Sequence, residues 1–166
     1  MNRKRRKEIF EAIGLIAIVV SVVFLALETR QNTNAVYAES RQSILTAAQS
    51  ELYQIVENPD LVVSVTKEDL LTEEEQVALS AWLTAAMRAR EFSWLQHRDG
   101  TIDEAQWITE VLVIRWILDS DRTRNWWVNV GRKNVNPSFA DFVDGDMQSH
   151  PGTGDSWRAE TNWAQH

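Results

Sequence analysis

The feature that most constrains this chain is a basic cluster that runs directly into a long apolar segment. Five of the first seven residues are Lys or Arg, and residues 9–27 contain a single charged residue, Glu11, with Lys7 four residues before it as a helix-face partner. A helix of these 19 residues would cover about 28 Å, close to the hydrocarbon thickness of a bilayer. The pattern predicts that residues 9–27 form a transmembrane helix in contact with membrane lipid.

Two other interpretations of this segment stay open. A cleaved signal peptide also begins with positive charge, and Val36-Tyr37-Ala38 offers suitable small residues, although this position lies far beyond Leu27. A buried helix of a soluble protein would rarely combine five basic residues with an almost continuous Val/Ile/Leu segment. We therefore favour a membrane anchor.

The charges on the two sides of the segment predict its orientation. Beyond residues 1–8, which form a basic tail, only Arg30 and Arg41 follow the apolar segment within about fifteen residues, and both have acidic neighbours. Because positive flanks stay in the cytoplasm, we expect a bacterial inner-membrane protein with a cytoplasmic N-terminus and a periplasmic C-terminal domain.

The part of the chain beyond the apolar segment is acidic. From Glu28 onward there are 22 acidic and 12 basic residues, a net charge of −10. Nucleic-acid binding needs clustered Lys and Arg, and the only such cluster is the N-terminal one, which an anchor explains. We therefore expect no nucleic-acid partner. Cysteine is absent, so disulfides and thiolate metal sites do not arise.

Helix signals dominate the remaining sequence and predict an all-α fold. The transmembrane helix either continues to about residue 57 or is hinged at polar residues 28–34, and a bundle of about four helices follows, in a domain spanning residues 28–144. Start and stop signals recur at Asn58-Pro59, Thr72 to Glu75, Gly100, Thr101 to Glu104, Ser120-Asp121 and Asn136-Pro137. In the helix after Gly100, Ile108, Val111, Leu112 and Trp116 are expected to form the apolar stripe. Residues 145–166 are polar and are expected to be a mostly disordered tail.

The order of these elements also resembles a known set of proteins. The apolar span is followed by Arg30-Gln31-Asn32-Thr33, the break at residues 58–61, the helix start at residues 71–75 and the segment 99–104, and then by Trp126-Trp127 and residues 139–143. This arrangement resembles a widespread family of small, uncharacterised bacterial proteins with one N-terminal membrane helix and a short helical domain. The resemblance implies an architecture and no activity.

Catalytic and metal-binding motifs are missing from the sequence. Histidine occurs only as His97, His150 and His166, without the Glu-x-x-His spacing of di-metal bundles. No nucleophile–base arrangement or phosphate-binding loop is present. We therefore expect a non-enzymatic chain without a cofactor or metal.

The charged residues inside apolar helices are the first candidate site. Arg115 lies between Val111 to Ile114 and Trp116 to Leu118, and we expect it to be partly buried and paired with Glu91 or Glu110, because an unpaired buried charge is costly. A pair that fixes helix register and an arginine that binds an anionic ligand are both compatible with this pattern.

Tryptophan supplies the second candidate site. Four of the eight tryptophans lie on the two central helices and either pack between helices or form an aromatic face for a ligand or partner. These four are Trp82, Trp94, Trp107 and Trp116.

Together these features favour a membrane-anchored interaction, scaffold or accessory module with an unidentified protein partner. The alternative is a membrane-tethered sensor that binds a small ligand between helices near Trp82, Trp94 and Arg115. Ala17 and Ser21, four residues apart in the anchor, also allow a homo-oligomer.

Overall fold

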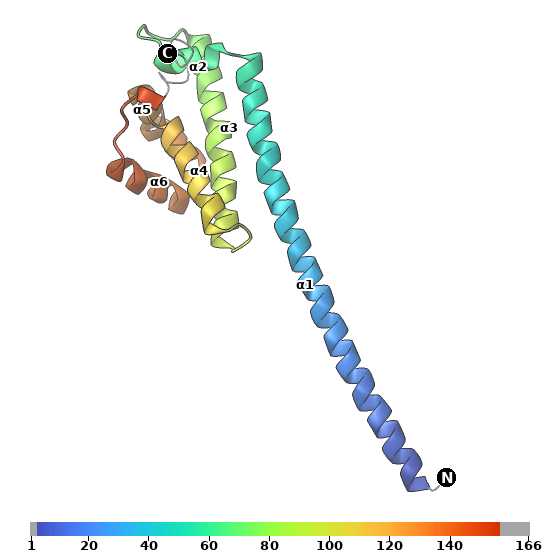
Figure 1. Cartoon of the computed structure of the whole chain (residues 1–166). Coiled ribbons are helices and arrows are strands. Elements are labelled where there is room, and N and C mark those ends of the chain that lie inside the picture. The colour runs from blue at the N-terminus through green and yellow to red at the C-terminus, as the bar shows by residue number, and fades with distance from the viewer. Residues whose placement is uncertain (1–2, 157–166) are drawn as a thin grey trace. The chain divides into compact units, whose positions relative to one another are not determined.

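Helices form all the regular structure in the part of the chain that the computed structural model describes (Figure 1). The backbone is described for residues 3–156, and side chains for residues 3, 7, 11 and 13–156. The elements are α1 (Arg3–Glu57), α2 (Asp60–Thr66), α3 (Glu73–Arg98), α4 (Glu104–Ile117), α5 (Asp121–Asn129), the 3-10 helix η1 (Gly131–Asn134) and α6 (Pro137–Ser149). The all-α prediction is confirmed.

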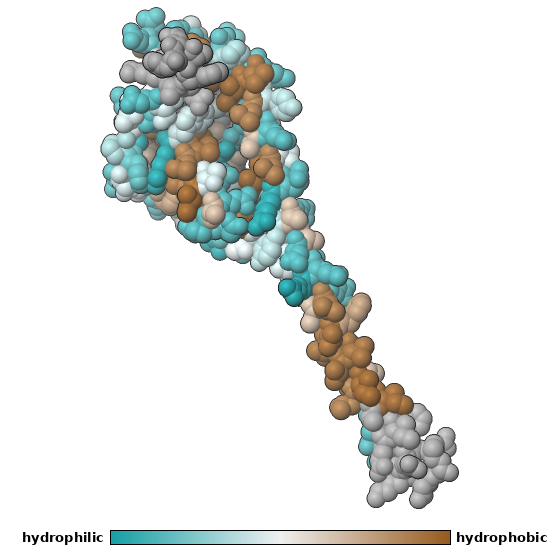
Figure 2. All heavy atoms as spheres, in the orientation of Figure 1, coloured by the Kyte–Doolittle hydropathy of each residue, from teal (hydrophilic) through white to brown (hydrophobic). Residues whose placement is uncertain are grey.

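The chain divides into two units, residues 1–39 and residues 40–166, and α1 contributes to both. In the first unit every large apolar side chain from Ile13 to Leu27 is at least half exposed, so no part of this unit covers them. Figure 2 shows these side chains as a continuous apolar band. One N-terminal helix is thus long and apolar enough to span a membrane. Residues 28–34 are helical, so α1 continues through the segment that the sequence offered as a hinge. The expected helix-face pair is present, since the Lys7 ammonium lies 3.8 Å from the Glu11 carboxylate.

The helices of the second unit begin at the capping residues that the sequence signals. The Thr72 hydroxyl accepts from the Glu75 amide (3.2 Å), and the Glu75 carboxylate accepts from the Thr72 amide (2.7 Å), which completes a capping box. Ser120 and Asn136 cap α5 and α6 with a single hydrogen bond each, accepting from the backbone amides of Thr123 and Ser138. The turn after α3 uses Gly100, whose φ of +73° favours glycine.

One predicted cap is wrong. Asp103, not Thr101, caps α4, because its carboxylate accepts from the Gln106 amide at 2.9 Å. The Thr101 hydroxyl instead donates to the Gln96 carbonyl at 2.9 Å and closes the turn between the helices.

The core of the second unit lies between α3, α4, α5 and α6. Its largest fully buried side chains include Trp127, Phe139, Leu83, Met87, Ile114, Ile117 and Val143. The apolar stripe predicted for α4 is partly wrong, since Ile108 and Leu112 are 51% and 55% exposed while Glu110 is buried. Helix α4 is rotated so that Glu110 points inward, where its carboxylate pairs with the cationic side chain of Arg90 on α3.

The polar tail is more ordered than the sequence predicts. Helix α6 extends to Ser149, and residues 150–156 are held by hydrogen bonds to α5 and to the residue before its cap. The rest of the predicted tail, with Trp157, Trp163 and His166, lies outside the described residues.

Candidate functional site

A buried arginine connects three helices of the second unit. The side chain of Arg90, in the middle of α3, is 6% exposed and donates to Glu51 on α1. Its Nε lies 3.2 Å from the carboxylate of Glu110 on α4. The Arg90 cation therefore holds the C-terminal half of α1 and helix α4 against α3.

Burial and charge act in opposite directions on the two carboxylates. Burial raises the pKa of Glu51 and of Glu110, and the Arg90 charge lowers both, with burial the stronger effect. The void beside Arg90 is only about 10 Å³, room for about one water molecule. The cluster therefore has no room for a substrate, and its evident role is to join helices.

Neither Glu51 nor Arg90 was a predicted site residue. A signal was present, since Leu79, Leu83, Ala86 and Arg90 recur at helical spacing and the first three are buried. A charged residue in line with a core stripe indicates a buried ion pair, and Arg90 fits this rule better than Arg115.

The predicted pairing of Arg115 with Glu91 or Glu110 is wrong. Arg115 donates to Asp146 on α6 with Nη2 at 2.7 Å and Nε at 3.0 Å. Glu91 accepts from Arg88 at 2.7 Å and from the Asn136 amide at 2.7 Å. The physical reason is that Arg115 and Glu110 lie on different sides of α4, facing α6 and α3. The acceptor Asp146 also lies in a segment where no helix was expected.

The four predicted tryptophans do not form one exposed face. Trp82 and Trp107 are buried, with 4% and 7% exposure. Trp107 stacks on His97 with ring centroids 5.5 Å apart, and Trp94 packs against Phe139 at 5.9 Å. Trp116 is half-buried on α4. Most of this aromatic surface therefore packs between helices, while Trp82 also lines a cavity described below.

The comparisons with known proteins identify no relative: no protein-family model, curated protein or solved structure matches this chain. Its function therefore has to be inferred from its own geometry.

Large apolar side chains are exposed on α4 and on the C-terminal half of α1. Arg41 on α1 binds Asp103 beside α4 at 3.1 Å, and Leu45 and Leu52 share a side of α1 with Arg41 by helical spacing. These leucines are 58% and 63% exposed. Together with Ile108 and Leu112 of α4, these leucines are the set of exposed apolar residues that we term the α1–α4 face. Figure 2 shows several apolar groups on the surface of the domain.

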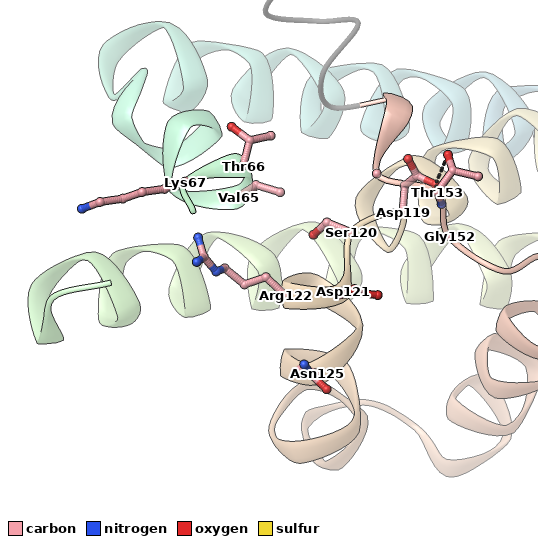
Figure 3. A pocket seen from close by; sticks show the side chains of 11 residues that line it. Val65, Thr66, Lys67, Asp119, Ser120, Asp121, Arg122, Asn125, Gly152 and Thr153 are labelled. Carbon is pink, nitrogen blue, oxygen red and sulfur yellow. Dashed lines mark hydrogen bonds between the residues drawn. The ribbon is translucent and has the colours of Figure 1, made fainter. Parts of the chain in front are cut away.

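Asp119 binds the segment that follows α6, residues 150–156, through hydrogen bonds to its backbone. The Asp119 carboxylate accepts from the amide of Thr153 at 2.9 Å (Figure 3). The carboxylate also accepts from the Ser156 amide (3.0 Å), and the Asp119 carbonyl accepts from the Gly154 amide (3.0 Å). A Cβ on Gly152 would lie 2.2 Å from the Asp119 carbonyl oxygen, so only glycine fits there. The docked segment lines one wall of a polar surface cavity of about 490 Å³. Among the described residues, no group of three His, Asp or Glu side chains is placed to hold a metal.

We expect Asp119→Asn to release residues 150–156. Burial raises the pKa of Asp119, but the amide donors outweigh it and the net pKa lies below its usual value. The stabilisation is thus present above the unfolded-state pKa and is lost as pH falls through the lower folded-state pKa. Limited proteolysis should cut the variant after residue 149 at least several-fold faster than the parent chain. Equal cleavage rates in Asp119→Asn and in the exposed control Asp155→Asn would contradict this role.

Proposed function

We propose that this chain is a single-pass protein of the bacterial inner membrane, with its N-terminus in the cytoplasm and its acidic helical domain in the periplasm. The apolar N-terminal helix and its five basic flanking residues support the anchor and its orientation. The same architecture is that of the family of small bacterial membrane proteins which the sequence resembles.

We further propose that the helical domain is a non-catalytic interaction module for a protein partner. The observation that carries this proposal is the α1–α4 face. Its four residues Leu45, Leu52, Ile108 and Leu112 are each more than half exposed, beside a core that buries residues such as Ile114 and Ile117 almost completely. We take these exposed apolar residues, two on each helix, as the protein-binding surface of the domain.

Charge indicates what kind of partner fits the α1–α4 face. The chain from Glu28 onward carries a net charge of −10, and Asp103 and Glu104 lie at the N-terminal end of α4, which borders the face. A helix with one apolar side and a basic rim would bury the leucines and neutralise these carboxylates. We therefore propose a basic amphipathic segment of another membrane-associated protein as the partner.

A ligand-binding function is the second candidate. A cavity of about 720 Å³ lies between the end of α1, α2 and α3, with Trp82 at its wall and polar residues such as Gln54 and Asn58 around it. Its size suits a small molecule. The α1–α4 face is the stronger observation, because the cavity is open to solvent and its polar lining residues come from three separate helices and the turn between two of them.

Photo-crosslinking in intact cells tests the interaction module. A photo-reactive residue at Ile108 or Leu112 should capture one partner, and Leu45→Lys in the same chain should reduce its yield about tenfold or more, since it buries a charge in the contact. A reactive residue at the exposed position Ser138 on α6 serves as the matched control. Equal capture from Ser138, or capture unaffected by Leu45→Lys, would contradict the proposal.

A further inference from the structure

A second interaction surface lies on α3 and α5, away from the residues that define the α1–α4 face. We infer that a second copy of this chain docks there, with Leu70 of each copy inserted in the groove of the other. This dimer contact does not depend on the proposed partner of the α1–α4 face.

The groove is apolar and already formed. It encloses about 600 Å³ and is lined by Leu71, Val77, Ala81, Trp126 and Val130, among others. The Trp126 indole donates to the Ser80 hydroxyl at 2.9 Å, which fixes the ring as one wall. Val77 is 70% exposed and Val130 is 40% exposed, so the groove presents apolar surface to solvent.

Three hydrogen bonds establish how the groove runs. Arg122 donates to the Asp69 carbonyl (3.0 Å), Trp126 to Ser80, and Arg88 to the Asn134 carbonyl (3.4 Å). The segment from α5 into η1 therefore advances in the same direction as α3. One end of the groove lies near residues 69–71, and the other lies near Val130.

Leu70 protrudes at the first of these ends. It is 94% exposed, the highest value among the large apolar residues whose side chains the structure describes, and its neighbour Leu71 lines the groove. An apolar projection beside an apolar hollow is self-complementary under a two-fold rotation, because each copy offers both parts. A two-fold axis across the groove would bring Leu70 of one copy to the Val130 end of its partner.

The charges at the two ends favour this pairing. Glu68, Asp69 and Glu73 are exposed beside Leu70, whereas Lys133 is exposed beside Val130. The two-fold rotation places the acidic end of one copy against Lys133 of the other, so opposite charges meet twice. Repulsion between two acidic domains is screened beyond about 8 Å at physiological salt.

Engineered cysteines test the register of the dimer, because the chain contains no cysteine of its own. Full-length Leu70→Cys and Val130→Cys chains, mixed in detergent micelles and oxidised, should give a cross-linked heterodimer. A mixture of Leu70→Cys with Ser138→Cys is the matched control and should give several-fold less product. Equal yields from the two mixtures would overturn the inference.

The dimerisation equilibrium provides the second measurement. In sedimentation experiments on the full-length chain, Leu70→Glu and Lys133→Glu should each raise the dissociation constant about tenfold or more. Adding Asp69→Lys to Lys133→Glu should restore much of the affinity, whereas Leu112→Glu on the α1–α4 face should change nothing. A chain that stays monomeric, or a dimer that tolerates Leu70→Glu, would show that the groove is not a self-docking site.

Discussion

Replacing Arg90 with methionine should destabilise the helical domain by about 3–5 kcal/mol, the usual result of removing one partner from a buried ion pair. The substitution would leave Glu51 and Glu110, whose side chains are 17% and 11% exposed, without their shared cation. Urea unfolding of the full-length chain in detergent, followed by tryptophan fluorescence, measures the free energy of unfolding. A loss of this size is a large fraction of the stability of a typical domain.

The controls separate loss of charge from loss of packing. Arg98→Met removes an arginine from the same helix, but its side chain is 56% exposed and its loss should cost less than about 1 kcal/mol. The triple variant Glu51→Gln/Arg90→Met/Glu110→Gln should recover most of the stability, because it removes the unpaired charges. If Arg90→Met costs no more than Arg98→Met, the cluster does not hold the helices together.

The pH dependence of the same cluster has a definite sign. Because burial raises the pKa of Glu51 and Glu110 in the folded state, their contribution to stability is fully present below the unfolded-state pKa and declines as pH rises through the folded-state pKa. The decline should be steeper in Arg90→Met, where the opposing positive charge is gone. The triple variant should lack this component of the pH dependence.

Two arginines in the apolar segment should abolish membrane insertion. Val19 and Val23 lie four residues apart and are 57% and 54% exposed. Each arginine near the centre of a spanning helix costs about 2.5–3.5 kcal/mol on insertion scales, so the pair should cost about 5–7 kcal/mol. Membrane fractionation after a salt wash should therefore find Val19→Arg/Val23→Arg outside the membrane pellet.

A matched pair elsewhere on α1 provides the control for this prediction. Thr46→Arg/Ser50→Arg has the same spacing on exposed positions of the helix and should stay with the membrane. In the parent chain, a reporter fused behind His166 should be active only in the periplasm. Membrane retention of the Val19/Val23 variant, or a reporter active only in the cytoplasm, would refute the anchor or its orientation respectively.

The features that sequence predicts well are those coded by neighbouring residues. The capping box at Thr72 and Glu75, the cap at Asn136 with Pro137, and the turn at Gly100 depend on contacts within about five residues, so their chemistry is visible in the sequence. The long apolar N-terminal helix is equally local, because its length and composition can be read directly from the sequence.

The candidate site was harder to predict because its contacts join distant segments. Arg90 meets a residue 39 positions earlier, and Arg115 meets one 31 positions later. Which charges pair depends on how each helix is rotated about its axis. In α4, Ile108 and Leu112 look as suitable for the core as Ile114, and only the tertiary fold places Glu110 inside. The docking of residues 150–156 on Asp119 likewise could not be predicted from the polar sequence of that segment, because the contact joins residues more than 30 positions apart.

The shared cation at Arg90 also limits how this protein can change over generations. A neutral residue at position 90 would leave the buried carboxylates of Glu51 and Glu110 without a positive partner at the same time. The loss of one of these glutamates would still leave Arg90 paired with the other. Descendants of this chain should therefore either retain all three charges or discard the arginine only after at least one carboxylate has gone, a historical order that ancestral reconstruction can reveal.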